Sequence, residues 1–407
     1  MPSHDPDNSK SAPPSPHHDT TPQFHPRENI RRMRFNLVEL SGAFGDLGTF
    51  LPLAAGMAYV AGMDLGLVFI FAGLGNLFAG VFFGLPIGVQ PMKAIAAVAI
   101  AETLLPGEIA AAGIIMGVIM LLFGLTRLAD AAERFIPLSV VRGIQLGIGI
   151  KLMLQAIEFV TGTPWFGFDS VTTAAAFGVF VVVSHRWAGF PGALLIFLAG
   201  LSVAFIETPG LVARLSVGPP QFDVVVPSHS AWINGLLFGA IPQLPLTILN
   251  SVLAICVLSG DLFPGRRIPA QRMSMSVGLI NLFTCWFGAI PMCHGSGGLA
   301  AQYHFGARTG GSLVMLGIFK LVVGTLFGTA AAIVVYAYPR SFLGVLLVFA
   351  GLELALNARH QTDKRGFTVL LLTASGAVAI NTLVGFLIGI VVHLTSSRRA
   401  GNHQTGP

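Results

Sequence analysis

An apolar stretch that cannot form one continuous helix, residues 83–97, constrains this chain more than any other feature. Two prolines, a glutamine and a lysine lie where a membrane-spanning helix would carry leucines. Each proline removes a backbone N–H donor and disfavours the α conformation of the residue before it, so residues 84–91 cannot form a regular helix. Pro91 suits the first turn of a new helix, where its missing N–H is no loss. The stretch therefore predicts a short helix that begins at membrane depth, with unpaired N–H groups and a positive dipole end at its start.

A second interrupted stretch, residues 287–301, repeats this pattern in the other half of the chain. Phe83 aligns with Phe287, which lies 204 residues later, and the same alignment places Gln90 opposite His294. Each half of the chain is therefore predicted to contain one broken segment.

A further match supports an internal repeat. Residues 42–47 align with residues 239–244, which lie 197 residues later, and this alignment pairs Asp46 with Gln243. Two interrupted apolar segments at corresponding places in two halves are the best sequence indication of a transporter's binding site.

The composition defines the class of protein. Hydrophobic residues make up 54% of the chain and charged residues only 10%, which is typical of a polytopic membrane protein embedded in a lipid bilayer. The net charge of +5 does not indicate nucleic-acid binding, because the basic residues form short clusters between apolar segments. The three cysteines lie in apolar segments without metal-ligand spacing, so no disulfide framework, metal site or cofactor is expected.

Fourteen apolar segments follow an N-terminal region that is rich in Pro, Ser and His. They cover residues 36–60, 65–84, 90–104, 108–126, 138–160, 172–184, 191–206, 231–258, 273–288, 293–302, 312–335, 341–356, 367–382 and 384–395. A full span needs about 20 residues, so the third and the tenth segments are too short to cross the membrane alone. The positive-inside rule supports this scheme, because 17 of the 23 Lys and Arg residues fall on the side predicted to be cytoplasmic.

These segments predict a domain organisation of two similar halves. We expect a disordered cytoplasmic tail over residues 1–34, a first repeat over 35–206, an external link over 207–230, a second, inverted repeat over 231–395 and a short cytoplasmic tail over 396–407. An odd number of segments in each half inverts the second half, and an even total places both termini in the cytoplasm. The two half-helices would then bring their N-termini together near a pseudo-twofold axis, and such a cavity suits a tetrahedral oxyanion.

Four blocks of sequence resemble the signatures of the molybdate transporter family, a branch of the sulfate permease superfamily. They are Glu39–Thr49, Val89–Ala96, Pro242–Thr247 and Cys293–Leu299. The resemblance runs from about Phe35 to His393 and implies the fold shared with uracil permeases, in which a core domain that carries the site moves relative to a gate domain. It also implies molybdate as the substrate and the absence of a cytoplasmic STAS domain. The expected fold class is therefore an all-α polytopic membrane protein, a 7+7 inverted-repeat transporter with core and gate domains and two half-helices preceded by short extended segments.

Polar residues at the two breaks are the candidate substrate ligands. Lys93 would cost about 3 kcal/mol in lipid unless it faces water or a partner, so we expect it to bind the anion or to pair with Asp46 or Glu39. Gln90 and His294 precede the half-helices and are expected to contact the oxyanion, although either could instead satisfy backbone groups at the breaks.

Residues near the breaks complete the predicted site. Gln243 should line the cavity, Thr49 and Ser296 could donate hydroxyl hydrogens, and Gly295 could allow close approach of the anion or simply ease helix packing. Asp46 and Glu39, seven residues apart on one face of the first segment, could carry a coupling proton, although a pair between Asp46 and Lys93 is favoured. Lys320 is assigned to an ion pair in the gate domain or to a snorkelling helix end.

The sequence predicts a secondary-active importer of a tetrahedral oxyanion in the cell membrane, and the resemblance to the molybdate transporter family implies that this anion is molybdate. Tungstate and sulfate are the alternative oxyanions, H⁺ is the expected coupling ion, and a homodimer is compatible with this interpretation. A nucleobase symporter and a passive anion channel are the alternative functions. An intramembrane hydrolase using Ser296 and His294 is disfavoured, because no orienting acid lies near them in the sequence, so no catalytic residue and no enzymatic activity are expected.

Overall fold

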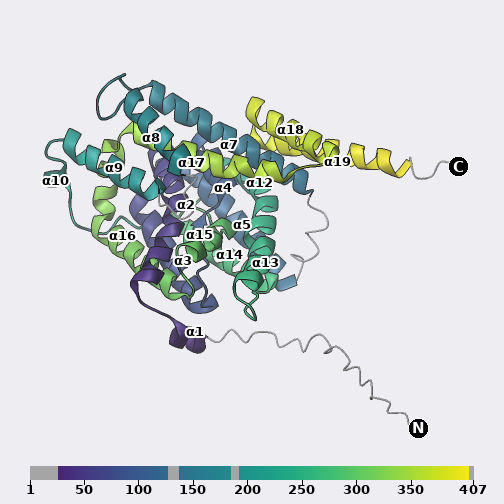
Figure 1. The fold of residues 1–407 in the computed structure, drawn as a ribbon, viewed down its shortest axis with the longest axis horizontal. Helices are drawn as coiled ribbons and strands as arrows, with labels where there is room; N and C mark the ends of the chain where they lie inside the picture. The colour runs from purple at the N-terminus through teal and green to yellow at the C-terminus, as the bar shows by residue number, and fades with distance from the viewer. Residues whose placement is uncertain (1–25, 127–136, 185–191, 403–407) are drawn as a thin grey trace, which may run out of the picture.

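The computed structural model describes residues 26–126, 137–184 and 192–402, and the first half of the chain is built almost entirely of helices (Figure 1). Its elements are α1 (Pro26–Arg32), α2 (Leu37–Ala61), α3 (Leu65–Phe83), β1 (Val89–Pro91), α4 (Lys93–Ala101), α5 (Pro106–Thr126), α7 (Leu138–Thr161), α8 (Val171–Ser184), α9 (Gly192–Glu207) and α10 (Leu211–Arg214).

The second half repeats this order of elements. It contains α11 (His229–Asn234), η1 (Gly235–Ala240), α12 (Ile241–Leu246), η2 (Thr247–Leu253), α13 (Ala254–Leu262), α14 (Ala270–Thr284), η3 (Cys285–Phe287), β2 (Met292–His294), α15 (Ser296–His304), α16 (Gly311–Ala337), α17 (Arg340–Ala355), η4 (Leu356–His360), α18 (Lys364–Ala379) and α19 (Thr382–Asn402). The segments η1 and η2 are π-helical, and they join α11, α12 and α13 into one continuous rod.

The predicted fold class is confirmed. Seven helical segments among the described residues are long and apolar enough to span a membrane, and three shorter apolar helices accompany them. The two half-helices α4 and α15 have nine residues each, and each follows a three-residue strand. A nine-residue helix is about 14 Å long, which is less than half of the hydrocarbon thickness. The chain therefore breaks at the two predicted places.

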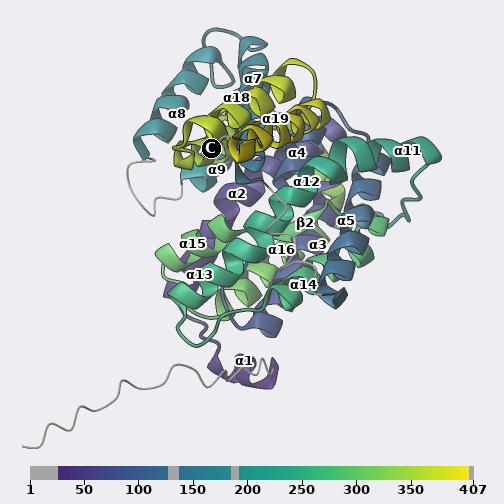
Figure 2. The ribbon, with the colours of Figure 1, turned by 90° about the vertical axis from the view of Figure 1, so that its right-hand side faces the viewer.

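The helices pack into two groups that match the expected core and gate domains. In the core, α3 packs against α16 and α5 packs against α14, which are equivalent pairs of the two repeats. In the gate, α7 packs against α17 and α18, and α8 packs against α17. Figure 2 shows α7, α18 and α19 together above the core helices α13, α15 and α3. The half-helix α4 touches both groups, because it packs against α2 of the core and α7 of the gate.

The strands give the true register of the repeat. In the antiparallel pair, Val89 lies opposite His294 and Gln90 lies opposite Cys293. A twofold axis through this pair makes Gln90 equivalent to Cys293, 203 residues later, and not to His294 as the sequence alignment predicted. The helices before the strands end at Gly84 and Gly288, both left-handed and 204 residues apart. The connection from Gly288 to β2 is therefore one residue shorter than the connection from Gly84 to β1. For this reason an alignment without a gap pairs the residues of the two strands one position out of register.

One asparagine in each half holds a strand in place. Asn76 Oδ1 of α3 accepts a hydrogen bond of 2.7 Å from Val89 N. Asn281 Oδ1 of α14 accepts one of 2.7 Å from Met292 N, and its Nδ2 donates to Met292 O at 2.5 Å. Val89 and Met292 lie outside the helices in a buried region, so their backbone groups need these side chains as hydrogen-bond partners. The two asparagines lie in the sequences Gly73–Phe78 and Gly278–Phe283, which share the pattern Gly-Leu-x-Asn-Leu-Phe. This match also indicates the internal repeat, and it lies outside the two sequence alignments described above.

The expected unstructured tail needs a correction at its C-terminal end. Residues 1–25 lie outside the described part, but Pro26–Arg32 form α1, and Asn29 in this helix is buried. Asn29 Nδ2 donates to Val81 O at 3.2 Å and to Phe82 O at 2.8 Å. These carbonyls belong to the last turn of α3 and have no partner within their own helix. The helix α1 is therefore ordered because it caps α3.

We predict that Asn281→Ala lowers the thermal unfolding midpoint of the detergent-solubilised protein more than Asn76→Ala does. Asn281 satisfies two groups of Met292, whereas Asn76 satisfies only Val89 N, and each buried group left unpaired costs roughly 1–3 kcal/mol. Asn357→Ala is the control, because this amide bonds only to carbonyls of its own helical segment. Equal shifts for all three variants would contradict a role of these asparagines in holding the strands.

Candidate functional site

The starts of the two half-helices meet in the strand pair. Pro91 of β1 lies opposite Met292 of β2, and Met92 N donates to Pro291 O at 2.8 Å. Gly295, the N-cap residue of α15, directly follows β2. The prediction that the two breaks come together is confirmed, and the pairing of their extended segments with each other is a feature that the sequence analysis did not predict.

A small cavity lies between these helix starts and the α12–η2 segment. Its free volume of about 20 Å³ holds about one water molecule. Five predicted residues line it: Gln90, Lys93, Gln243, Gly295 and Ser296. Gly297, Cys293, Pro91, Leu246, Asn250 and Ser251 complete the wall.

Asn250 and Ser251 line the cavity, although neither residue is among those predicted from the sequence. Both lie in the π-helical segment η2, and Asn250 follows Gln243 by seven residues. Residues seven apart lie near one face of a helix, so a search for polar residues in phase with Gln243 could have found Asn250. Pro242 and Pro245 lie just before η2, where missing N–H donors weaken the regular helix.

Gln243 closes one of the two helix starts. Its Oε1 accepts hydrogen bonds from Ala94 N at 2.8 Å and Ile95 N at 3.3 Å, both in the first turn of α4. Its Nε2 donates to Thr247 Oγ1 at 2.8 Å, which fixes the direction of the amide. Gln243 lines the cavity as predicted, but its carbonyl oxygen occupies backbone donors that an anion would otherwise use.

The start of α15 is open by comparison. Its N-cap residue Gly295 has no side chain, and no described side chain accepts a hydrogen bond from the amides of Ser296, Gly297 or Gly298. The unpaired amides at the start of a helix, together with its dipole, favour an anion. The side chain of Lys93, the first residue of α4, lines the same cavity.

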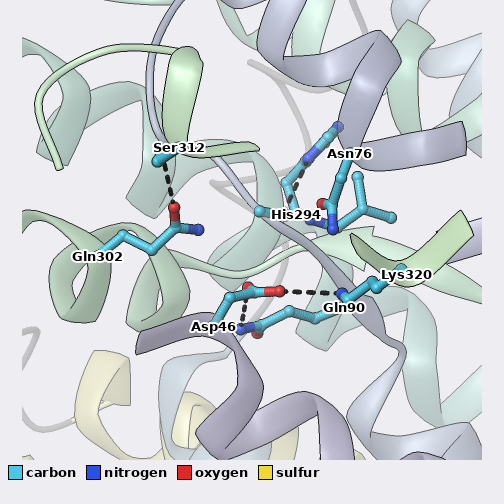
Figure 3. A network of polar contacts seen from close by, with 9 residues as sticks. Asp46, Asn76, Gln90, His294, Gln302, Ser312 and Lys320 are labelled. Carbon is cyan, nitrogen blue, oxygen red and sulfur yellow. Dashed lines mark hydrogen bonds and ion pairs between the residues drawn. The ribbon is translucent and has the colours of Figure 1, made fainter. Parts of the chain in front are cut away.

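Lys93 supplies the only charge among the described residues that line the cavity. It makes no hydrogen bond or ion pair with any described residue, so the predicted pair with Asp46 or Glu39 is wrong. Asp46 pairs instead with Lys320 of α16, with Oδ2 and Nζ 3.3 Å apart (Figure 3). Lys320 Nζ also lies 3.7 Å from the centre of the Phe50 ring.

The prediction for Lys320 is wrong as well. Its side chain and that of Asp46 are both completely buried, and α16 packs against α2 and α3 in the core. The helical rotation of α16 directs Lys320 to Asp46 and away from lipid, which composition and spacing could not show. Burial of two opposite charges is tolerable here because each neutralises the other and makes a second favourable contact.

Gln90 connects this buried pair to the cavity. Its Nε2 donates to Asp46 Oδ1 at 2.8 Å, while its Oε1 has no hydrogen-bond partner among the described residues. The amide lies flat against the start of α15, because a Cβ at Gly295 would collide with Gln90 Oε1 and one at Gly298 would lie 2.5 Å from Gln90 Nε2. These two glycines therefore make room for the Gln90 amide, whereas a Cβ at Gly297 would meet open space.

Four predicted residues lie outside the cavity, and one of them is Asp46, which pairs with Lys320. His294 Nε2 is 2.8 Å from Ser276 Oγ, and Nδ1 is 3.3 Å from Gly88 O, so its ring points away from the cavity. Thr49 does not line the cavity either. Glu39 accepts hydrogen bonds of 3.2–3.3 Å from Arg308 N and Thr309 N in the loop before α16. Among the described residues no cluster of three or more His, Cys, Asp or Glu side chains could hold a metal ion.

Sequence comparison identifies close relatives. Residues 38–152 and 235–354 match the family described as "Molybdate transporter of MFS superfamily". Molybdate transporter 1 of Arabidopsis thaliana is 40% identical, over 92% of this chain and 91% of that protein. Molybdate transporter 2 of Arabidopsis thaliana is 39% identical, over 88% and 86%. Molybdate transporter 1 of Chlamydomonas reinhardtii is 32% identical, over 87% and 90%.

Solved structures show the same fold at low sequence identity. Murine Slc26a9, an anion transporter in the inward-facing state, matches with a TM-score of 0.66 at 12% identity, over 92% of this chain and 71% of that one. The transmembrane domain of the cyanobacterial bicarbonate transporter BicA matches with a TM-score of 0.62 at 16% identity, over 87% and 97%. The family description names the MFS superfamily, whereas the fold is the one seen in Slc26a9 and in the transmembrane domain of BicA.

We predict that Gly295→Ala and Gly298→Ala each strongly reduce anion transport, because the added methyl group displaces the Gln90 amide. Gly178→Ala in α8 is the matched control, since a Cβ there meets nothing within 4 Å. Initial rates of anion uptake, normalised to the amount of folded protein in the membrane, measure the effect. Rates of Gly295→Ala and Gly298→Ala equal to that of Gly178→Ala would show that the position of Gln90 does not matter.

Proposed function

The chain belongs to the molybdate transporter family, and we propose that it is a secondary-active transporter that imports molybdate by alternating access. Its relatives are named as transporters, and its fold is that of membrane anion transporters. The protein is thus a multi-pass membrane anion transporter and not an enzyme. The identity of the anion, the direction and the mechanism are the parts that we propose.

The observation that carries this proposal is the cavity wall at the start of α15. Unpaired amides and glycines lie on one side and the Lys93 ammonium group on the other, with no acidic side chain among the described lining residues. A helix start contributes about half a positive charge, and Lys93 contributes a full one. Ser296, Ser251 and Asn250 add side-chain donors. A dianion that presents acceptors in four directions and no donors matches this wall.

The contacts of the half-helix α4 support a transport cycle with distinct conformations, because they link the cavity to the gate helices. The half-helix α4 carries Lys93 at its start and Glu102 at its end. Glu102 Oε1 is 2.6 Å from Lys151 Nζ of α7 and accepts a hydrogen bond of 2.9 Å from Thr382 Oγ1 of α19. A shift of the gate helices would therefore act directly on α4.

Further parts of the proposal follow from the charge pattern and the fold. We propose that both termini lie in the cytoplasm, because basic residues concentrate on that side of the predicted segments, and that the protein resides in the cell membrane. Protons are the proposed coupling ion, and tungstate is a second substrate because it has the same charge and shape. Among the sequence-predicted residues, Lys93, Gln90, Gly295 and Ser296 form the binding site, and Gln243 supports it by capping α4.

Uptake of radiolabelled molybdate into cells that lack their own molybdate uptake systems tests the function. We expect uptake that is competed by excess tungstate more strongly than by sulfate, and accumulation that a protonophore abolishes. Stronger competition by sulfate would assign the protein to sulfate transport. Uptake that never exceeds electrochemical equilibrium would indicate a channel, and competition by uracil would indicate a nucleobase symporter.

We predict that Lys93→Ala raises the apparent KM for molybdate roughly tenfold to hundredfold, because a hydrogen bond to a charged group contributes about 1.5–3 kcal/mol. The variant should fold normally, since Lys93 makes no hydrogen bond or ion pair with any described residue. Lys364→Ala, which removes an exposed lysine at the start of α18, is the control. A wild-type KM in Lys93→Ala would remove this residue from the binding site.

A further inference from the structure

A buried ion pair lies one side chain away from the proposed anion site. Asp46 and Lys320 are both inaccessible to solvent, and their charges cancel. Asp46 uses its second oxygen to accept the hydrogen bond from Gln90 Nε2. Figure 3 shows the contacts that lead from Lys320 through Asp46 to Gln90. Gln90 lines the cavity, so the chain of contacts ends at the cavity wall.

The amide of Gln90 has the wrong polarity for an anion in this arrangement. Because Asp46 accepts from Nε2, the Oε1 atom of Gln90 faces Gly295 and has no hydrogen-bond partner among residues 26–126, 137–184 and 192–402. An unpaired carbonyl oxygen at the wall of an oxyanion site repels the ligand, and an unsatisfied buried acceptor also costs about 1–3 kcal/mol. The arrangement seen here is therefore suited to the protein without bound anion.

Neighbouring groups have unused hydrogen-bonding capacity of the same kind. Gln302 Nε2 has no hydrogen-bond partner in the part of the chain that the structure describes, although its Oε1 accepts from Ser312 Oγ at 3.2 Å. A Cβ at Gly88 would collide with Asp46 Oδ1 and lie 2.9 Å from Gln302 Nε2, so both side chains reach the same glycine. The network around Asp46 can thus exchange partners without large movements of the backbone.

We propose that Asp46, Lys320 and Gln90 form the coupling unit of this transporter, in which protonation of Asp46 reverses the Gln90 amide and so prepares the cavity for the oxyanion. This inference rests on the proposed function, proton-coupled import of molybdate. A protonated Asp46 donates its O–H to Gln90 Oε1 in place of accepting from Nε2. The turned amide then directs its two N–H hydrogens to the cavity, where an oxyanion accepts them.

The charge balance supports the same coupling. In the state seen here the Asp46–Lys320 pair is neutral, whereas the added proton cancels the charge of Asp46 and leaves the Lys320 ammonium group beside the site. The unit gains one positive charge as the dianion enters, and release of the anion on the other side of the membrane allows the proton to leave. Coupling of this kind is reciprocal, so the bound anion also favours proton uptake. At least one proton is carried in each cycle.

Other charged or titratable groups on the elements packed against α2 are engaged elsewhere or lie apart from the pair. Lys93 lines the cavity, Glu102 pairs with Lys151, Glu39 binds the loop before α16, and His294 contacts Ser276 and Gly88. The remaining ones make no ion pair or hydrogen bond with Asp46 or Lys320: Tyr59 of α2, Tyr303 and His304 of α15, Tyr336 of α16, Glu207 of α9, and Arg340 and Glu353 of α17. Asp46 is therefore the acid through which a proton can act on Gln90.

The test uses purified protein in proteoliposomes with the membrane potential clamped and an inward proton gradient imposed. We expect the wild-type protein to accumulate radiolabelled molybdate in response to the gradient. Asp46→Asn should retain molybdate exchange at a reduced rate, because the asparagine amide can donate to Gln90 Oε1 as a protonated acid does. The proton gradient should no longer drive accumulation by this variant.

A second variant distinguishes a loss of proton coupling from a folding defect. Asp46→Asn leaves the Lys320 charge buried without its partner, which can destabilise the protein strongly. The double variant Asp46→Asn/Lys320→Gln removes both charges and should restore the yield of folded protein, but not gradient-driven accumulation. If the pair were only structural, the double variant would recover accumulation as well, and that result would overturn the proposal.

Glu39→Gln is the matched control, because Glu39 is the other buried acid of α2 and bonds only to backbone amides of the loop before α16. This variant should still accumulate molybdate in response to the proton gradient. Gradient-driven accumulation by Asp46→Asn would refute the role of Asp46. Loss of this accumulation in Glu39→Gln, with its retention in Asp46→Asn, would refute it too. A wild-type protein that transports no molybdate would instead refute the proposed function.

Discussion

Two breaks in the membrane-embedded chain leave backbone groups that must find hydrogen-bond partners inside the protein, and the core is arranged to supply them. The strands β1 and β2 pair with each other, and Asn76 and Asn281 bond to the strands from neighbouring helices. Gln243 then caps the start of α4 from a third helix. Because these partners come from different elements, satisfying the breaks also fixes where the two half-helices meet.

The inverted repeat does not make the two helix starts equivalent. The start of α4 is capped by Gln243, whereas the start of α15 begins with glycines and keeps its amides available. At the position that corresponds to Gln243, the first repeat carries Asp46, whose charge is balanced by Lys320. One half of the site thus holds its helix in place, and the other half combines an open anion-binding end with a group that can take up a proton.

The sequence predicted the fold well because prolines, short apolar segments and repeated blocks report directly on local backbone structure. It predicted the individual contacts less well, because these depend on helix rotation and strand register. The sequence predicts Lys320 in a gate-domain ion pair or at a snorkelling helix end, yet its position around α16 directs it to Asp46. His294 was aligned with Gln90, but the true register differs by one residue, and a shift of one residue in a strand moves a side chain to the opposite face.

The proposed oxyanion site lies between Lys93 and the start of α15, and molybdenum itself can report on its occupancy. A crystal structure with bound molybdate, measured at the molybdenum absorption edge, locates the metal by its anomalous scattering. We expect an anomalous peak within the cavity, in contact with Lys93, Ser296 and Gly297. A peak outside this cavity, in protein that still transports molybdate, would contradict the proposed site.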